Sequence, residues 1–317
     1  MVKFYIKHLT KYTYSNTVID AANLIRLHPL NDDYQKVISH TISVTNNAYI
    51  QQFTDFYNNS FGTFMITEPH EELSIESVVE VNTYNKMLPE DTMPIDEQWA
   101  ALKNVKKHTD YIDFTFPSKA FASCAEILSL MDTIDKKTHS PYQVVLQLCE
   151  YIYKNFNYIQ GVTTVNSTPE EAWHLKAGVC QDFTNVLLQL IRMTGIPARY
   201  VSGYICPSDI LTRGEGATHA WVEAYIPYYG WLGIDPTNNT IVNGNHVRLA
   251  VGRHYADCAP VKGVYKGNVE ATMLVKVEIG TTKNNQPDYT QLKDFVPLAT
   301  NSYQQNLEII QHQQQQQ

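Results

Sequence analysis

The sequence has few cysteines and few charged residues, and each shortage excludes a class of protein. Its five cysteines are odd in number, lie scattered over 317 residues and include no C-x-x-C pair. A disulfide framework and a structural zinc site are therefore both disfavoured. Charged residues make up 18% of the chain and apolar residues 44%, against a usual charged fraction of about 25%. This composition is typical of a globular protein and not of a disordered one.

Excess positive charge and long apolar runs are also absent. The net charge of -8 leaves no surplus of cations to neutralise phosphates, so we expect neither nucleic acid nor an anionic membrane as a partner. No uncharged apolar run reaches the roughly 18 residues of a membrane-spanning helix. Lys3 and Lys7 interrupt the N-terminus before the apolar region of a signal peptide can develop. We therefore expect a cytoplasmic protein.

The first part of the chain has the two-residue periodicity of β-strands. Phe4 to Tyr14 alternate between two faces. Further strand-like runs, separated by Asn, Gly or Pro and without a helical pattern between them, are residues 35–44, 49–56, 63–67 and 73–81. We expect an antiparallel β domain, in the form of a sandwich, over residues 1–95. A connecting segment with a short helix should follow over residues 96–118.

Beyond Pro141 the periodicity changes to that of helices. Apolar residues recur at helical spacing as far as Phe156, and again from Phe183 to Ile191, where Gly195 ends the pattern. The strand-like runs that follow are residues 198–204, 219–226, 231–235 and 271–279. Helices followed by strands predict an α+β domain, over residues 119–282, in which helices pack on an antiparallel sheet. Residues 283–317 would form a C-terminal extension with a disordered glutamine-rich tail.

Cys180 is the cysteine whose position indicates chemistry. It opens the second predicted helix, so its sulfur should lie near unsatisfied backbone N–H groups and the positive end of the helix dipole. That environment favours the thiolate. Most cysteines are simply buried, but here the apolar stripe begins three residues later, at Phe183. The cysteines that lack a helix-start pattern, and that we expect to be packing or surface thiols, are Cys124, Cys206 and Cys258.

Two predicted strands supply a base and a carboxylate. His219 opens one strand, and Asp235 ends the next, directly before Pro236, which prevents further ladder pairing. A short turn joins the strands, so the hairpin can bring Asp235 beside His219. Taken singly, His219 could be a core histidine and Asp235 a turn cap, but the ordered set of cysteine, histidine and aspartate is more specific. His174, expected in a loop after Trp173, is a rival base.

Four segments carry a resemblance to a known family. The chain resembles the transglutaminase-like superfamily, specifically its bacterial branch of cysteine-protease-like proteins, and His8-Leu-Thr-Lys-Tyr-Thr-Tyr14 is similar to the β-rich N-terminal region of that branch. The core segments are Gly178-Val-Cys-Gln-Asp-Phe183, Gly195-Ile-Pro-Ala-Arg-Tyr-Val-Ser-Gly-Tyr204, His219-Ala-Trp-Val-Glu223 and Gly230-Trp-Leu-Gly-Ile-Asp-Pro-Thr-Asn238. The resemblance implies a papain-like α+β fold.

The resemblance also implies roles for three residues. Cys180 would be the nucleophile, His219 the general base and later acid, and Asp235 the group that orients the imidazolium. The chemistry would be acyl transfer through an S-acyl enzyme that water or an amine resolves. We expect a cysteine protease or amidase acting on peptide or isopeptide bonds of a peptide or protein substrate. The alternatives are a protein-glutamine transglutaminase and an inert peptide-binding module of the same fold.

Several details of the expected site stay open at this stage. The oxyanion needs donors about 3 Å away; the N–H of Cys180 is one candidate, and a side chain of Tyr158, Trp173 or Gln181 could be the second. Cysteine, histidine and aspartate can also hold zinc, but the helix-start thiolate and the resemblance favour a nucleophile. We therefore expect no metal and no cofactor. We also expect the glycine-rich residues 207–217 to form a mobile loop beside the cleft.

Overall fold

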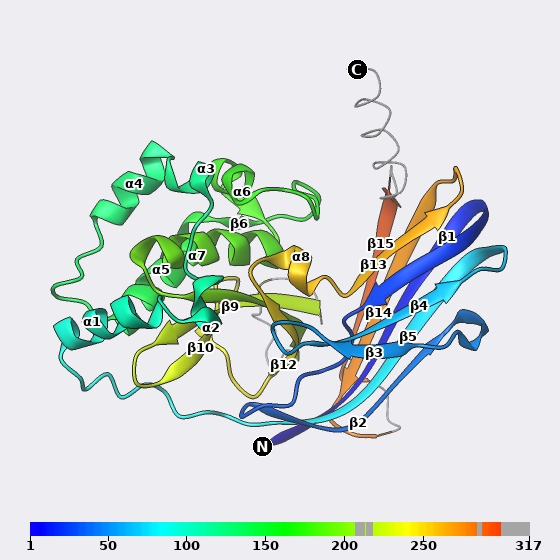
Figure 1. Cartoon of the computed structure of the whole chain (residues 1–317), viewed down its shortest axis with the longest axis horizontal. Helices are drawn as coiled ribbons and strands as arrows, with labels where there is room; N and C mark the ends of the chain where they lie inside the picture. The colour runs from blue at the N-terminus through cyan, green and yellow to red at the C-terminus, as the bar shows by residue number, and fades with distance from the viewer. Residues whose placement is uncertain (207–212, 214–217, 284–286, 299–317) are drawn as a thin grey trace. The chain divides into compact units, whose positions relative to one another are not determined.

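The chain folds into two compact units. A computed structural model describes residues 1–206, 213, 218–283 and 287–298 (Figure 1). One unit combines Met1–Thr83 with Ala259–Gln317, and the other is Tyr84–Cys258. Both ends of the chain therefore contribute to the first unit, whereas the second is one continuous segment.

The described residues of the first unit form an eight-stranded antiparallel sheet. Strand β1 organises it, because its first half pairs with β14 and β5 and its second half with β13 and β4. Between the two halves, Asp20 has a positive φ of 50°. Strand β1 continues through this residue from one part of the sheet into the other. The predicted antiparallel β domain is confirmed. Its elements are β1 Val2–Ile25, β2 Gln35–Val44, the 3-10 turn η1 Thr45–Asn47, β3 Gln51–Thr54, β4 Ser60–Ile66, β5 His70–Thr83, β13 Val261–Lys266, β14 Ala271–Gly280 and β15 Tyr289–Leu298.

The C-terminal strands lie in a different unit from the one that the sequence predicts. Strand β14 was expected in a domain over residues 119–282, yet it pairs with β1 from Tyr5 opposite Gly280 to Tyr14 opposite Ala271 (Figure 1). The boundaries at residues 95 and 282 therefore differ from the observed ends of the units, at Thr83 and Cys258. A two-residue alternation identifies a strand but contains no information about its neighbour.

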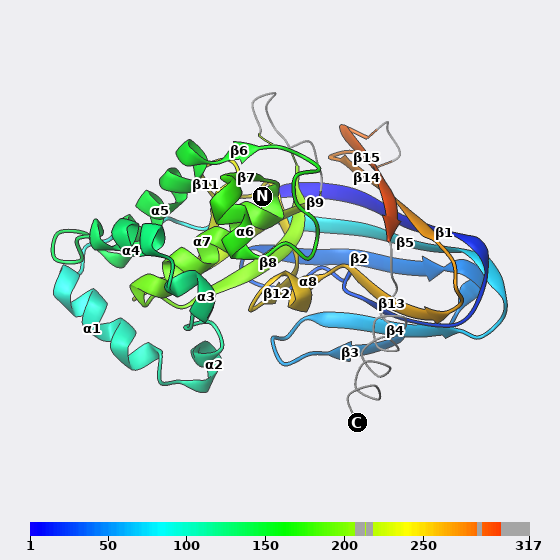
Figure 2. The same cartoon turned by 90° about the horizontal axis from the view of Figure 1, so that it is seen from above.

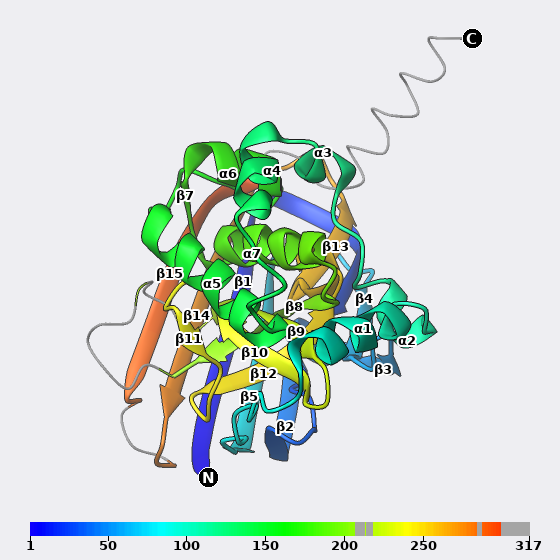
Figure 3. The same cartoon turned by 90° about the vertical axis from the view of Figure 1, so that its left-hand side faces the viewer.

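The second unit packs helices on an antiparallel sheet of order β11-β10-β9-β8-β12. Helix α7 lies across this sheet, with α5 beside it (Figures 2 and 3). The predicted α+β class is confirmed. The helices are α1 Ile95–Val105, α2 Thr109–Ile112, α3 Lys119–Ala122, α4 Ala125–Asp132, α5 Pro141–Asn155, α6 Pro169–Leu175, α7 Cys180–Thr194 and α8 Tyr255–Cys258. The strands are β6 Asn157–Tyr158, β7 Ala177–Gly178, β8 Ala198–Ile205, β9 Thr218–Ile226, β10 Gly230–Asp235, β11 Thr240–Ile241 and β12 His246–Gly252.

Local signals fix the ends of the two central helices. Ser140 caps α5, because its hydroxyl accepts the N–H of Gln143 while the Gln143 side chain accepts the N–H of Ser140. Pro141 occupies the first turn, where its missing N–H costs nothing. Helix α7 ends at Gly195, whose φ of 91° suits glycine and would strain another residue. The apolar stripes of both helices are buried in one core.

The two faces of the sheet have opposite characters. Ala220, Val222 and Ala224 of β9 belong to the apolar core that contains α7. The alternate residues of β9 are His219, Trp221, Glu223 and Tyr225. The other face, here called the polar face, therefore holds buried charged groups among aromatic rings. Glu223 forms ion pairs there with Arg199, at 2.7 Å, and with Arg248.

A bulge in β12 lets that strand serve both faces. The pairing of β12 with β8 shifts register between Arg248 and Ala250. Arg248 thus lies on the polar face, while Ala250 belongs to the apolar core.

Two expectations concern residues outside the described part of the chain. They are the mobile loop over residues 207–217, of which the structure describes only Arg213, and the tail over residues 313–317. Within the described ranges, no helix combines the length and the apolar character needed to cross a membrane.

The pairing of β14 with β1 predicts where a core substitution will act. Val277 of β14 is fully buried, and truncating such a side chain costs roughly 2 kcal/mol. We expect Val277→Ala to speed hydrogen exchange of the β1 amides by roughly tenfold or more while leaving α7 unchanged. The control is Thr272→Ala, at an exposed position of the same strand. Faster exchange in α7 instead would show that β14 stabilises the other unit.

Candidate active site

Cys180 is the first residue of α7, as the sequence predicts, and its side chain is partly exposed. The turn that holds it is fixed by Asp182, whose carboxylate accepts the N–H of Val179 at 2.8 Å and the hydroxyl of Thr163 at 2.7 Å. Gly178 leaves room for this carboxylate, since a Cβ there would lie 2.5 Å from Asp182 Oδ2. The thiol therefore starts the helix from a rigid, hydrogen-bonded turn.

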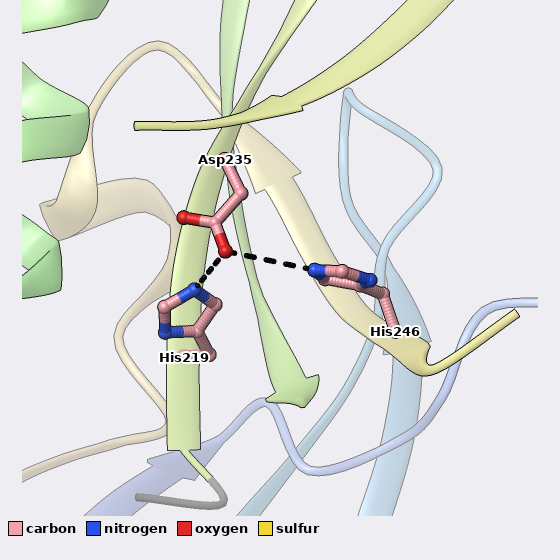
Figure 4. A group of neighbouring side chains, drawn as sticks. All are labelled: His219, Asp235 and His246. Atoms are coloured by element: carbon pink, nitrogen blue, oxygen red, sulfur yellow. Dashed lines mark hydrogen bonds and ion pairs between the residues drawn. The ribbon is translucent and has the colours of Figure 1, made fainter. Parts of the chain in front are cut away.

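His219 and Asp235 meet across the predicted hairpin. Nε2 of His219 lies 2.8 Å from Oδ2 of Asp235, and both side chains are buried (Figure 4). Oδ1 of Asp235 also accepts the N–H of Thr237 at 2.9 Å, and Oδ2 accepts the Asn238 amide at 2.7 Å. Hydrogen-bond donors thus offset the free-energy cost of burying this carboxylate, which has no contact with solvent.

The electrostatics of this pair favour an imidazolium beside a carboxylate. Burial lowers the pKa of His219, but the charge of Asp235 and hydrogen bonds with Asp235 and Cys180 outweigh burial and raise this pKa to about 10. Burial raises the pKa of Asp235, but the charge and hydrogen bonds of His219, aided by His246, hold it well below its usual range. Because Nε2 of His219 is bonded to Asp235, Nδ1 is the ring nitrogen left for the Cys180 thiol.

His246, at the start of β12, is a site residue that the sequence did not reveal. Its Nε2 lies 3.8 Å from Oδ2 of Asp235, the oxygen that also binds His219 (Figure 4). The alternation of polar and apolar residues from His246 onward is a strand signal. It could not identify β8 as the neighbouring strand, and this pairing places His246 beside the hairpin.

His219, Asp235 and His246 could also hold a metal ion. Their ligand atoms lie within 4.8 Å of one another and all three residues are buried. Two imidazoles and a carboxylate suit zinc chemically. An ion would have to replace the 2.8 Å hydrogen bond that joins His219 directly to Asp235. We therefore interpret the three residues as two imidazoles grouped around one carboxylate, with His219 hydrogen-bonded to Asp235.

The structure distinguishes between the candidates for the second oxyanion donor. Trp173 is wrong for this role: its indole N–H, the only donor of that side chain, is bonded to Glu126 at 3.0 Å. Gln181, next to the thiol, donates one amide hydrogen to the carbonyl of Val165 at 3.1 Å and has a second hydrogen to offer. Tyr158 lies in β6, which pairs with β7 directly before α7. Gln181 and Tyr158 remain candidates.

Two other expectations need correction. His174 lies in the last turn of α6, not in a loop, and is exposed. Cys124 does precede a helix, because it is the N-cap residue of α4, and it is partly exposed. Cys206 and Cys258 are buried, as expected of packing thiols.

Comparison with known proteins identifies the family. Residues 129–236 match the transglutaminase-like superfamily, and residues 4–82 match the bacterial transglutaminase-like N-terminal region. An uncharacterized protein of Mycobacterium leprae is 30% identical over 284 residues, which cover 88% of this chain and 99% of that protein. The chain belongs to the transglutaminase-like superfamily. The resemblance in the sequence and the papain-like α+β fold are thereby confirmed.

Two further relatives of this transglutaminase-like protein carry functional names. A crystal structure named "Putative Cysteine Protease", from Cytophaga hutchinsonii, superposes with a TM-score of 0.68 at 25% identity and covers 93% of this chain and 98% of that chain. The Protein-glutamine gamma-glutamyltransferase of Pseudomonas aeruginosa is 28% identical over 152 residues, or 44% of this chain and 23% of that protein. The similarity to the first therefore extends over both units.

The raised pKa of His219 predicts how stability depends on pH. A histidine whose pKa rises on folding, here from 6.5 to about 10, stabilises fully below about pH 6.5, and this contribution is lost as the pH rises toward 10. We expect the free energy of unfolding of the wild type, relative to His219→Gln, to fall across this window by more than about 1.4 kcal/mol, the equivalent of one pKa unit.

Urea unfolding at a series of pH values measures this difference. His174→Gln, which changes an exposed histidine of α6, is the matched control for the loss of a histidine. A flat difference for His219→Gln would mean that His219 is not charged in the folded protein.

Proposed function

We propose that this protein is a thiol-dependent acyl-transfer enzyme, a cysteine protease or amidase that hydrolyses peptide or isopeptide bonds. Cys180, His219 and Asp235 would form its catalytic triad. The observation that carries the proposal is the buried ion pair of His219 and Asp235. Cys180, the thiol at the start of α7, adds to the groups that raise the pKa of His219. A structural neighbour over nearly the whole chain that is named as a cysteine protease supports it.

The proposed reaction has two halves. The Cys180 thiolate attacks the amide carbonyl, His219 protonates the leaving amine, and the carbon–nitrogen bond breaks to leave an S-acyl enzyme. Water then attacks the thioester while His219 takes one of its protons. The carbon–sulfur bond breaks, and the carboxylic acid leaves with Cys180 restored as a thiolate beside the protonated His219. Asp235 stabilises the imidazolium in the first half, because a buried carboxylate acts strongly at 2.8 Å.

Protein-glutamine transglutamination is the second candidate function. It would use the same thioester but resolve it with a primary amine. The relative from Pseudomonas aeruginosa with that name, which matches 44% of this chain, favours it. Hydrolysis stands first because water needs no dedicated binding site.

Alkylation of the cysteines by iodoacetamide tests the nucleophile. If His219 supports a thiolate, Cys180 should react at about pH 6, well below the ordinary cysteine pKa of about 8.5. We expect Cys180 to be alkylated at least about tenfold faster than Cys124 at that pH, and His219→Ala to abolish the difference. Mass spectrometry assigns the modified residue.

Cys124 is an informative control because it is also partly exposed at a helix start. Equal rates at the two cysteines, indifferent to His219, would mean that the helix start alone sets reactivity. The inert binding module would then be the better interpretation.

Product analysis separates the two candidate functions. A glutamine-rich protein such as casein is incubated with the enzyme and a fluorescent primary amine, with Cys180→Ala as the matched control. Hydrolysis predicts new peptide termini and little label, since water competes with the amine in an open site. Label incorporated without new termini would make the protein a transglutaminase.

A further inference from the structure

Three strands of the second unit converge on one carboxylate. His219 of β9 and His246 of β12 both direct Nε2 toward Oδ2 of Asp235, at the end of β10 (Figure 4). We propose that His246 is a positioning residue, which keeps Asp235 ionised and aimed at His219 while His219 gains and loses its proton. The proposal deepens the proposed function and rests on it for its catalytic consequence.

The hydrogen bonds of His246 indicate which ring nitrogen carries its proton. Nδ1 accepts the backbone N–H of Asn243 at 3.4 Å, so the neutral ring carries its proton on Nε2. That Nε2 is buried and has no partner within hydrogen-bond distance among the described residues. Its nearest charge is Asp235 Oδ2, at 3.8 Å. A donor is thus held less than about 1 Å beyond bonding distance of the carboxylate.

A neutral His246 suits this role better than a charged one. Burial lowers the pKa of His246, and although Asp235 raises it, the positive charge of His219 lowers it further. His246 therefore presents a neutral donor to Asp235 without competing as a second cation. When His219 has given its proton to the leaving group, the uncompensated charge of Asp235 attracts the Nε2–H of His246.

Asp235 needs an anchor outside its own turn. Its donors Thr237 and Asn238 follow it by two and three residues and so move with it. Within the described part of the chain, His219 and His246 are the side chains that approach this carboxylate from other elements. If His219 were the only group outside this turn that contacted the carboxylate, the ring and the carboxylate could shift together, because no third element would hold either of them.

Packing holds His246 firmly in its place. The fully buried Trp221 meets its ring edge-on, with centroids 5.2 Å apart and planes at 78°. Gly203 of β8 leaves space for that indole, because a Cβ there would lie 2.7 Å from Cη2 of Trp221. The bulge beyond Arg248 keeps this end of β12 on the polar face.

The first test measures the pKa of His219 by NMR in a Cys180→Ala background, so that it does not depend on a reactive thiol. The titratable groups that face His219 and Asp235 from neighbouring elements are His246 of β12, Cys149 of α5 and Cys180 of α7. In this background we expect His246→Leu to lower the pKa of His219 by about one unit, a tenfold change in its proton affinity. His246→Gln, whose amide can still donate, should change it by less than about 0.3 units.

A matched control separates positioning from folding. Val247→Ala removes buried volume from the next residue of β12, whose side chain points to the opposite face, and should lower the melting temperature without moving the pKa of His219. His246→Asn, too short to reach Asp235, replaces His246→Leu if the latter does not fold. An unchanged or raised pKa of His219 in the folded variant would overturn the proposal.

The second test follows alkylation of Cys180 against pH in the wild-type background. We expect His246→Leu to move the acid limb of the profile up by about one unit, while His246→Gln and Val247→Ala leave it in place. A wild type without an activated thiol, together with the NMR shift, would overturn the proposed function and leave the positioning role supported. If the wild type has an activated thiol but His246→Leu leaves its alkylation profile unchanged, only the positioning role is overturned.

Discussion

The ion pair between His219 and Asp235 is the interaction around which the second unit is built. Asp235 is fully buried, and an ionised carboxylate in such a place is costly unless donors surround it. The turn after β10 supplies two of those donors, and β9 supplies the imidazolium at 2.8 Å. Each partner makes the charge of the other tolerable, which is why their pKa values move in opposite directions.

This constraint explains the two faces of the sheet. The face toward α7 is apolar and supplies the core that holds the helix, and with it Cys180, in place. The other face carries the buried charges in two groups, Asp235 with its histidines and Glu223 with Arg199 and Arg248. The strand periodicity keeps the groups apart from the apolar core, and the bulge in β12 lets one strand contribute to both faces.

In the first unit, strand pairing connects the N-terminal segment of the chain with the segment that follows Cys258. Strand β1 needs partners on both edges along its whole length, and the segment after Cys258 supplies one of them. The match to the bacterial transglutaminase-like N-terminal region, residues 4–82, therefore covers only part of the sheet. The remaining strands come from the C-terminal segment.

Elements with local signals could be predicted from the amino-acid sequence. Pro141, Gly195 and the apolar stripes predicted the two central helices. The strand-start position of His219 and the strand-end position of Asp235 predicted that the hairpin would bring these two side chains together. The hairpin contact was predictable because a short turn leaves two strands few ways to pair.

The contacts between distant segments were not predictable and became visible only in the folded chain. It brought β14 to β1, occupied the donor of Trp173 with Glu126, and placed His246 on the carboxylate of Asp235. Periodicity along a strand reports which face a side chain occupies, whereas pairing between strands depends on the fit of surfaces that are distant in the sequence. His246 shows the difference: its face can be read from its neighbours in the chain, but its partner cannot.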